Sequence, residues 1–390
     1  MASRRSRGLR RLFFFLPDQR NLQETNFNAL LLAMDERTLL KLRLNNQQLI
    51  QSQFDKPGEL VKWMGAVQAQ DFFGSLWAIN IRLNKFLTEP EIERAITDKT
   101  IVRSWPMRGT LHFCAPEDLR WMLKYLTPRV FARFKSILEK DGIDSKVRTK
   151  SKKVFEKILS GGNQLTRDEM YEALEKAKVS TKGTRGLHLL GTAAQDGLIC
   201  FGPRAGKQHT FVLTDEWIPS KSPMPSEEEA MAELARRYVR SHGPVIVEDF
   251  AWWAGLNKGE SNAAFQSIAN ELETVMVNEK EFWFDPASTD TKPKTGKAYL
   301  LPTYDEYGIA YKNRDEFIHN DEYSLIGGLF TSAIMMNGKM IGTWRRVLEK
   351  KSVKIEFKPF QEFTSVQENA IHKEAKRYST FIGFEAYVTM

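Results

Sequence analysis

Hydrophobic and polar positions follow a repeating order along most of this chain. From Met34 onward, three short segments with apolar residues at helical spacing are followed by two short β-type runs separated by a turn. This group occurs three times, at residues 34–145, 146–218 and 226–290. Three helices followed by a hairpin are typical of a winged-helix unit, so the pattern predicts three such units in tandem.

The second group shows the pattern most clearly. Thr166 precedes a helical segment and Glu169 stands three residues later, which is the signature of a capping box. We expect the other helices at 152–160 and 184–195. The predicted strands, 198–201 and 210–213, flank a turn rich in Gly, Pro, Arg and Lys at 202–208.

The first and third groups are predicted in the same way. In the first, we expect helices at 37–53, 58–67, 72–83 and 89–97, a hairpin at 101–105 and 110–113, and a connecting helix at 116–138. The third group is weaker. After a Pro- and Ser-rich linker at 219–226, helical segments run from Ser226 to Ala254 and from 262 to 272, and strands are expected at 274–277 and 281–284.

From about Lys297 the pattern changes to strands. They are expected at 298–301, 325–336, 339–346 and 352–357, followed by a helix at 365–378. Asn337-Gly338 between two strands is a strong hairpin signal. The sequence therefore predicts an α+β protein whose C-terminal unit, 297–390, is a small β-barrel or a curled sheet.

Residues 1–33 differ from the rest of the chain. They contain six arginines against Asp18 and Glu24, so they carry +4 of the net charge of +8. The apolar run from Leu12 to Leu16 is too short for a secretory signal. We expect a poorly packed, dispensable extension with the natural start at Met34; a mitochondrial presequence is the alternative.

Composition narrows the class of protein. Hydrophobic residues make up 42% and charged residues 27% of the 390 positions, as in ordinary globular proteins, and no apolar run approaches a membrane span. Two cysteines and six scattered histidines supply neither a disulfide framework nor metal-ligand spacing. We therefore expect a cytoplasmic protein with no cofactor and no metal, and the net charge of +8 favours a polyanionic partner.

Two glutamines stand between apolar helices of the first unit. Gln68 and Gln70 flank Ala69 just before the predicted helix at 72–83. Polar side chains held there need hydrogen-bond partners or solvent. Residues two apart in an extended segment point to the same side, so the two amides are candidates to share one pocket. The alternative is that both amides cap backbone groups at the helix junction.

The first hairpin combines cationic, aromatic and polar side chains, as a protein that grips phosphates and opens a base stack requires. The candidates are Arg103, Trp105, Arg108, Thr110 and His112. A hairpin whose Trp and His face the core is the alternative. In the second unit, the third helix and the turn of the hairpin supply further candidates for DNA contact: Lys182, Arg185, His188, Arg204 and Lys207.

Five sequence blocks together resemble the winged-helix DNA-binding family that includes AlkZ- and YcaQ-type DNA glycosylases. They are GAVQAQD at 65–71, SLWA at 75–78, RSWPMRGTLH at 103–112, LPTYDEY at 301–307 and GTWRR at 342–346. The resemblance covers the chain from about Asp35 to its end. It implies three winged helices braced by a β-barrel around a DNA-sized cleft.

The resemblance also implies an activity. AlkZ-like members carry a catalytic Gln-φ-Gln motif, with φ aliphatic, which Gln68-Ala69-Gln70 matches; YcaQ-like members have Asp at the second position, and Asp71 stands one position too late. We expect a monofunctional DNA glycosylase, monomeric and nucleoid-associated in a bacterial cytoplasm. Its partner would be double-stranded DNA with alkylated or crosslinked purines, which leave as neutral bases and so need only amides to orient water.

Three other functions compete with this reading. A transcriptional regulator without catalysis would keep the DNA-binding argument and give Gln68 and Gln70 a structural role. An interaction scaffold would use the third unit and the C-terminal unit to bind protein. A Mg²⁺-dependent nuclease would need an acidic cluster, for which Asp305-Glu306 is the candidate pair, although a solvated loop is the default for it.

Overall fold

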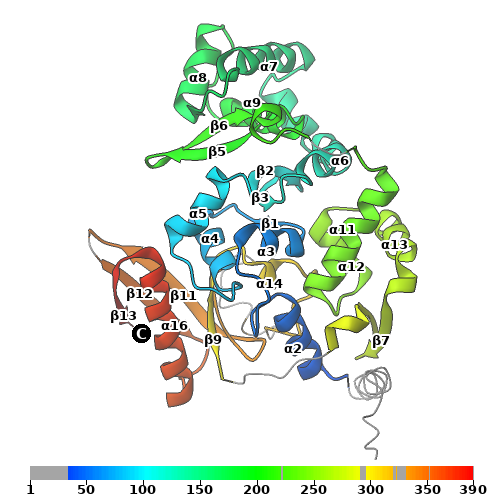
Figure 1. The fold of residues 1–390 in the computed structure, drawn as a ribbon, viewed down its shortest axis with the longest axis vertical. Coiled ribbons are helices and arrows are strands. Elements are labelled where there is room, and N and C mark those ends of the chain that lie inside the picture. The colour runs from blue at the N-terminus through cyan, green and yellow to red at the C-terminus, as the bar shows by residue number, and fades with distance from the viewer. Residues whose placement is uncertain are drawn as a thin grey trace, which may run out of the picture.

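The computed structural model describes residues 34–220, 223–289, 296–318, 322, 331–350 and 352–389. The predicted extension at 1–33 and the first part of the predicted strand at 325–336 lie outside the described residues. Figure 1 shows the second unit at the top of the molecule and the first unit near its centre, with the third unit and the C-terminal unit on opposite sides below.

The first unit contains the predicted helices and hairpin, together with one short strand. Its elements are α2 (Glu36–Asn46), α3 (Pro57–Met64), β1 (Val67–Gln68), α4 (Phe72–Asn80), α5 (Glu89–Thr97), β2 (Val102–Met107) and β3 (Thr110–Cys114). Helix α2 ends seven residues before the predicted position of Gln53, because Gln48 takes a φ of 62°, which a helix does not allow.

The second unit follows the connecting helix α6 (Leu119–Lys140). It comprises α7 (Ser145–Leu159), β4 (Leu165–Thr166), α8 (Arg167–Lys176), α9 (Arg185–Gln195), β5 (Ile199–Ala205), β6 (Gln208–Leu213) and the short α10 (Thr214–Trp217). The predicted capping box is confirmed, since Thr166 caps α8 and Glu169 accepts from the Thr166 backbone. Helix α7 starts seven residues before the predicted Lys152 because Asp144 caps it, accepting from the amide of Val147 at 2.8 Å.

The hairpins of the first two units share one sheet. Its strand order is β1-β3-β2-β5-β6-β4, and the two hairpins meet where Arg103 of β2 pairs with Phe201 of β5. Trp105 and Leu111 from the first hairpin are part of the hydrophobic core of the second unit. The sequence pattern predicts each hairpin separately, but it does not reveal that the two pair edge to edge.

The third unit also has three helices and a hairpin. It consists of α11 (Glu227–His242), α12 (Val247–Ala254), α13 (Lys258–Ser267), the 3-10 turn η1 (Ala269–Glu271), β7 (Glu273–Val277) and β8 (Lys280–Phe284), followed by η2 (Pro286–Thr289). Helices α11 and α12 share a hydrophobic cluster with α6, so this unit packs against the connecting helix.

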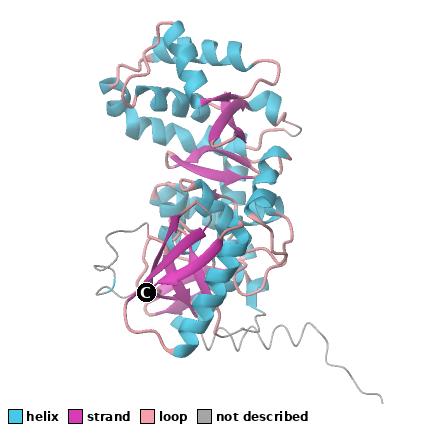
Figure 2. Ribbon diagram, turned by 90° about the vertical axis from the view of Figure 1, so that its left-hand side faces the viewer, coloured by secondary structure: helices cyan, strands magenta, loops and turns pink. Residues whose placement is uncertain are grey.

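The C-terminal unit is a curled five-stranded sheet among the described residues, one of the two forms expected for it (Figure 2). Its strand order is β13-β12-β11-β10-β9, and the final strand β13 is absent from the sequence prediction. The elements are β9 (Ala298–Leu301), α14 (Glu306–Ile309), β10 (Ala333–Met336), β11 (Lys339–Leu348), β12 (Ser352–Pro359), α16 (Ser365–Ile382) and β13 (Glu385–Thr389).

One hydrophobic cluster joins the first unit to the C-terminal sheet and α16. Trp77 of α4 is fully buried in it and donates its indole N–H to the carbonyl of Leu300 in β9 at 2.7 Å. Burial of such a side chain contributes about 3 kcal/mol, so the contact fixes the first unit on the sheet. The loop after β9 is thereby held against β1, where the candidate glutamines lie. The α+β fold class is confirmed, whereas the winged-helix assignment and the limits of the units stay predictions.

Candidate functional site

Gln68 is held by its backbone on one side and by its side chain on the other. In β1 it pairs with His112 of β3, and the next amide, that of Ala69, donates to the carbonyl of Leu111 at 2.7 Å. The Gln68 side chain is 7% exposed, and its Oε1 accepts from Nη2 of Arg108 at 3.2 Å. The carboxamide is therefore fixed at the hairpin rather than free in solvent.

Gln70 lies in a different environment. Its side chain is exposed, and its Oε1 accepts from the amide of Leu111 at 3.3 Å. Asp71 then caps α4 by accepting from the amide of Gly74. The expectation that both amides project into one pocket is not confirmed, because Gln68 lines the cavity described below and Gln70 is not among its lining residues.

Arg108 occupies the tip of the first hairpin and connects three groups. Its φ is 57° and that of Gly109 is 79°, as a two-residue hairpin turn requires. Besides Gln68, it contacts the carbonyl of Trp253 through Nη1 at 2.7 Å and Nε2 of His112 through Nη2 at 3.2 Å. These bonds hold a non-glycine residue in a left-handed conformation that costs about 1 to 2 kcal/mol.

His112 is fully buried and neutral. Burial, together with the adjacent Arg108 cation, lowers the pKa of His112 to about 3. Its Nδ1 lies 2.9 Å from the carbonyl of Thr110, so Nδ1–H donates there and Nε2 accepts from Arg108. His112 therefore orients Arg108 and, being fully buried, offers no surface to DNA, which corrects its prediction as a DNA-contacting residue of the first hairpin.

A cavity of about 590 Å³ lies beside Gln68 and is open to solvent. Trp252 forms part of its wall and is 40% exposed, with its indole N–H donated to the carbonyl of Ile309 at 2.9 Å. Three of the predicted residues line the cavity: Gln68, Arg108 and Thr110. Its other lining residues are Arg133, Glu248, Ala251, Trp252, Gly255, Leu256, Lys258, Ile309 and Lys312. An exposed indole at a cavity wall is suited to stack on a base.

A buried carboxylate, that of Glu306, lies behind Gln68. One oxygen of Glu306 accepts from the backbone N–H of Gln68 at 2.7 Å, and the other accepts from the indole N–H of Trp253 at 2.9 Å. Burial alone would raise the pKa of Glu306, but the interaction with His242 and the nearby Arg108 outweigh it and lower the pKa. The carboxyl group is 1% exposed and ionised.

The default interpretation of Asp305-Glu306 as a solvated loop is wrong. Asp305 is 4% exposed and accepts from both terminal nitrogens of Arg82, at 2.7 and 2.8 Å. A signal was present in the sequence, since the pair follows the apolar strand at 298–301 and stands between aromatic residues. Alone, that signal could not identify Gln68, more than 200 positions earlier, as the partner of Glu306.

Two predicted DNA contacts lie in the protein interior. Arg103 is 4% exposed, donates to the carbonyl of Ala69 at 2.8 Å, and lies over the ring of Phe201. Trp105 is 9% exposed, with its ring centre 5.1 Å from that of Phe201. The structure thus gives both side chains a packing role at the junction of the two hairpins, and neither presents a face to a duplex.

The predicted contacts of the second unit divide into paired and free cations. Arg204 forms a two-pronged ion pair with Glu93 of α5, with both distances 2.6 Å, and Arg185 donates to the carbonyl of Ser180 at 2.9 Å. Lys182 precedes α9, and Lys207 is at the hairpin turn; both are exposed. Of the contacts predicted for this unit, these two lysines are exposed as a phosphate contact requires.

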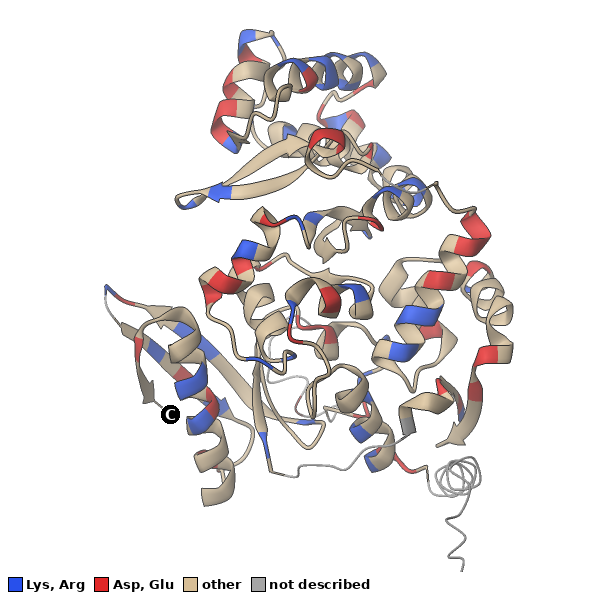
Figure 3. Cartoon of the chain, viewed as in Figure 1, with Lys and Arg blue, Asp and Glu red and all other residues tan. Residues whose placement is uncertain are grey.

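A stripe of lysines on α7 was missed by the sequence analysis. The stripe consists of Lys146, Lys150, Lys153 and Lys157, which are exposed and stand three or four positions apart, the spacing of neighbours on a helix surface. Figure 3 shows that α7, at the top of the molecule, is rich in Lys and Arg. Arg148 and Lys152 of the same helix pair with Asp196, whereas the four stripe lysines have no ion-pair partner among the described residues. The spacing is visible in the sequence, but the winged-helix pattern predicts DNA contacts on the third helix and the hairpin turn, and α7 is neither of these.

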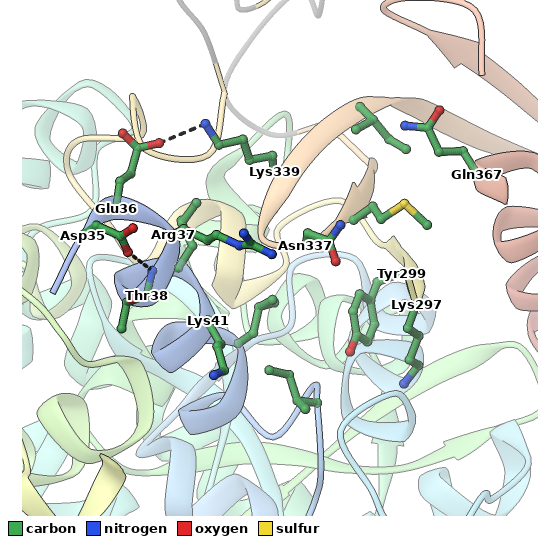
Figure 4. A pocket seen from close by; sticks show the side chains of 15 residues that line it. Asp35, Glu36, Arg37, Thr38, Lys41, Lys297, Tyr299, Asn337, Lys339 and Gln367 are labelled. Atoms are coloured by element: carbon green, nitrogen blue, oxygen red, sulfur yellow. Dashed lines mark hydrogen bonds and ion pairs between the residues drawn. The ribbon is translucent and has the colours of Figure 1, made fainter. Parts of the chain in front are cut away.

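A larger cavity than the one beside Gln68 lies elsewhere in the molecule. It measures about 830 Å³ and lies between α2 and strands β9 to β11, where Lys339 pairs with Glu36 at 2.9 Å (Figure 4). None of the predicted site residues lines it. Across the described ranges, no cluster of three metal-binding side chains occurs, and no helix there has the length and apolar character needed to cross a membrane.

Comparisons with known proteins agree with this fold. An interstrand DNA cross-link repair glycosylase of Streptomyces sahachiroi is 26% identical over 357 residues, which are 87% of this chain and 94% of that protein. The solved structure of the Streptomyces sahachiroi DNA glycosylase AlkZ superposes with a TM-score of 0.74 at 21% identity, covering 91% of this chain and all of that one. Residues 61–381 match the family described as DNA glycosylase AlkZ-like. Because this match extends over most of the sequence, the chain belongs to the AlkZ-like family of DNA glycosylases.

Proposed function

We propose that this DNA glycosylase hydrolyses the N-glycosidic bond of purines alkylated at nitrogen 7 or 3 in double-stranded DNA, including purines tied into interstrand cross-links. The observation that carries the proposal is the position of Gln68, whose fixed carboxamide lines a solvent-open cavity between the first and third units. The name of the Streptomyces relative, a cross-link repair glycosylase, supports the choice of substrate.

The chemistry suits an amide. A purine alkylated at a ring nitrogen is already cationic and leaves as a neutral base, so the enzyme has to hold a water and tolerate the cationic sugar. The Oε1 atom of Gln68 uses one lone pair for Arg108 and retains a second for that water. Gln70, exposed two residues later, would hold the water or the sugar from the DNA side.

A cross-linked purine cannot be rotated out of the duplex, because it is tied to the opposite strand. A site that is open to solvent can act on such a base where it lies, whereas a closed pocket requires extrusion. The cavity beside Gln68 is of the open kind, and Trp252 and Ile309 give it apolar walls for the face of a base.

In this proposal, exposed lysines that form no ion pair among the described residues hold the DNA. Lys182, Lys207 and the α7 lysine stripe would contact phosphates of the duplex beside the lesion, and Arg108 would contact the strand or the lesion at the cavity. Thr110 lines the same cavity and would contact the sugar. The protein would act as a monomer in the bacterial cytoplasm.

The test is incubation of the protein with duplexes carrying 7-methylguanine or a nitrogen-mustard cross-link, followed by alkaline strand cleavage at abasic sites. We expect cleavage of both damaged duplexes and none of an undamaged one. If the protein binds duplex DNA tightly yet excises neither lesion, it acts as a non-catalytic DNA-binding protein instead.

The proposed enzyme is monofunctional, so it leaves an intact abasic site. A bifunctional enzyme would need a neutral lysine to attack the sugar. Lys258 lines the cavity, but its hydrogen bond with Glu248 raises its pKa and keeps it protonated. We expect no covalent complex with abasic DNA after borohydride reduction; a trapped complex would show lyase chemistry.

A further inference from the structure

The wall of the cavity carries mostly positive charge. Arg108, Arg133, Lys258 and Lys312 line it, and its acidic lining residue, Glu248, is paired with Lys258 at 2.8 Å. Such a wall attracts phosphates, but it repels the sugar cation that forms as the base leaves. A negative group close to the reacting centre would offset this charge, and the acidic lining residue is already paired.

Glu306 is placed to supply that charge. Its carboxylate lies directly beneath Gln68, bonded to the backbone N–H at 2.7 Å, and its other oxygen is bonded to Trp253 at 2.9 Å. Trp253 adjoins the cavity residue Trp252, and Ile309 at the end of the same helix α14 lines the cavity. The buried carboxylate is thus bonded to the backbone of Gln68, which itself lines the cavity.

The Arg108 cation and the ring of His242, whose Nε2 lies 3.7 Å from the carboxylate, interact with Glu306, but the groups bonded directly to it carry no formal charge. Burial lowers the pKa of His112 to about 3 and also lowers that of His242, so both imidazoles are neutral at physiological pH. Both hydrogen-bond donors to Glu306, the Gln68 amide and the Trp253 indole, are uncharged. Arg108 is a cation that acts on Glu306 without bonding to it, since its own bonds go to the Gln68 side chain, the carbonyl of Trp253 and His112.

We propose that Glu306 is a positioning residue for the glycosylase reaction: it fixes the backbone of Gln68, and its buried carboxylate offsets the cationic cavity wall so that a positive sugar can form there. This inference rests on the proposed function. It assigns to a neutral-amide motif the negative charge that other glycoside-cleaving sites supply from an enzyme carboxylate beside the sugar. The charge acts at short range through protein, where screening is weak.

The first test is Glu306→Gln, which keeps the shape and an acceptor for Gln68 but removes the charge. At saturating protein, the single-turnover excision rate of 7-methylguanine should fall about 30-fold or more, which is near the lower end of the effect of removing one electrostatic group. The dissociation constant for undamaged duplex should change less than twofold. A rate within threefold of the unaltered protein would overturn the proposal.

The second test separates charge from structure. Duplexes carry either a pyrrolidine abasic analogue, which is cationic like the sugar at the transition state, or a neutral tetrahydrofuran analogue. The unaltered protein should bind the cationic analogue more tightly, and Glu306→Gln should lose about tenfold of that preference. A variant that merely loosens the fold would weaken both complexes alike, and an unchanged preference would refute the electrostatic role.

Asp118→Asn is the matched control. Asp118 is 3% exposed and also accepts from an indole, that of Trp121 at 3.1 Å, but its other partner is Arg237 and it does not line the cavity. Excision by this variant should stay within threefold of the unaltered protein, and it should retain the cation preference. Loss of either to the extent seen in Glu306→Gln would attribute the effect to any buried carboxylate and overturn the assignment.

Glu306→Asp keeps the proposal testable if Glu306→Gln does not fold. The shorter carboxylate of this variant retains the charge but withdraws from Gln68. The variant should therefore excise slowly and still prefer the cationic analogue; loss of the preference would contradict the proposal.

Gln68→Ala distinguishes the failure of this inference from the failure of the proposed function. If the unaltered protein excises and Gln68→Ala does not, while Glu306→Gln excises normally, Glu306 is wrongly assigned and the proposed function stands.

Discussion

The hairpins of the first and second units have the same topology, but protein encloses the turn of the first and solvent surrounds the turn of the second. Each follows a helix, a two-residue strand and two helices, and in each the short strand pairs with the second strand of the hairpin, β1 with β3 and β4 with β6. A Cβ at Gly109 in the first turn would lie 3.1 Å from Val130 and 3.2 Å from Phe134 of α6, whereas one at Gly206 in the second would meet nothing within 4 Å. One tip is enclosed by protein and the other is in solvent.

This difference decides what the cation at each tip can do. Arg108 is desolvated and contacts Gln68, His112 and the carbonyl of Trp253, so it fixes the orientation of the Gln68 amide. Lys207 at the open tip is a hydrated charge, which can attract phosphates but cannot fix a geometry. In the proposed function, chemistry therefore belongs to the enclosed hairpin and electrostatic attraction of DNA to the open one.

Removing the amides is expected to have the largest effect. Gln68→Ala and Gln70→Ala should each leave folding and DNA affinity nearly unchanged and lower single-turnover excision of 7-methylguanine about 10²-fold, as expected for loss of a group that positions the water. Lys207→Ala at the open hairpin is the matched control, with an unchanged rate at saturating protein. Normal excision by the double glutamine variant would refute the mechanism.

Gln70→Asp sharpens the same comparison. YcaQ-like members carry Asp at this place, and the exposed position of Gln70 leaves room for a hydrated carboxylate. This variant should retain activity when assayed beside Gln70→Ala. Activity as low as that of the alanine variant would mean that the amide nitrogen of Gln70, and not an acceptor oxygen, is required.

The enclosed hairpin should also make stability depend on pH. The pKa of His112 is about 3 in the folded protein and about 6.5 when unfolded, so the unfolded chain binds the extra proton as the pH falls. The contribution of neutral His112 to the free energy of unfolding is complete above pH 6.5. It is lost progressively below that pH, and the loss is about 2 kcal/mol at pH 5. His112→Asn should flatten the decrease in unfolding free energy between pH 7 and 5 in urea titrations; an unchanged slope would show that another group titrates.

The sequence predicted most of the elements but not how they assemble. Periodicity located α5 and the helix capped by Thr166 because these signals are local. The pairing of β2 with β5 and the bond between Glu306 and Gln68 join segments about 100 and 238 positions apart, and no local pattern encodes them. The motif identified Gln68, whereas the burial of Arg103 and the carboxylate behind Gln68 became apparent only from packing.

Charge removal in the second unit should affect binding rather than chemistry. Replacing Lys150 and Lys153 by Gln removes two stripe cations, so the plot of log affinity for duplex against log salt should lose a slope of about 2. The excision rate at saturating protein should stay unchanged. Lys373 and Lys376 on α16 are exposed with the same spacing, and their replacement should leave the slope as it was. Equal slopes for both variants would place the duplex away from α7.

The smallest expected difference is between a glycine packed against Arg108 of the first hairpin and a glycine in the turn of the second. Gly255, at the end of α12, has a φ of 72° and Gly206 a φ of 61°, so alanine at either place costs about 1 kcal/mol of backbone strain. Only at Gly255 would the new Cβ lie 2.9 Å from Cγ of Arg108, which must then move away from Gln68. Both variants should lose similar stability in urea titrations, but Gly255→Ala should excise about tenfold more slowly and Gly206→Ala at the normal rate. If both excise equally well, contact of Arg108 with Gln68 does not matter to the reaction, and enclosure of the first hairpin serves the fold alone.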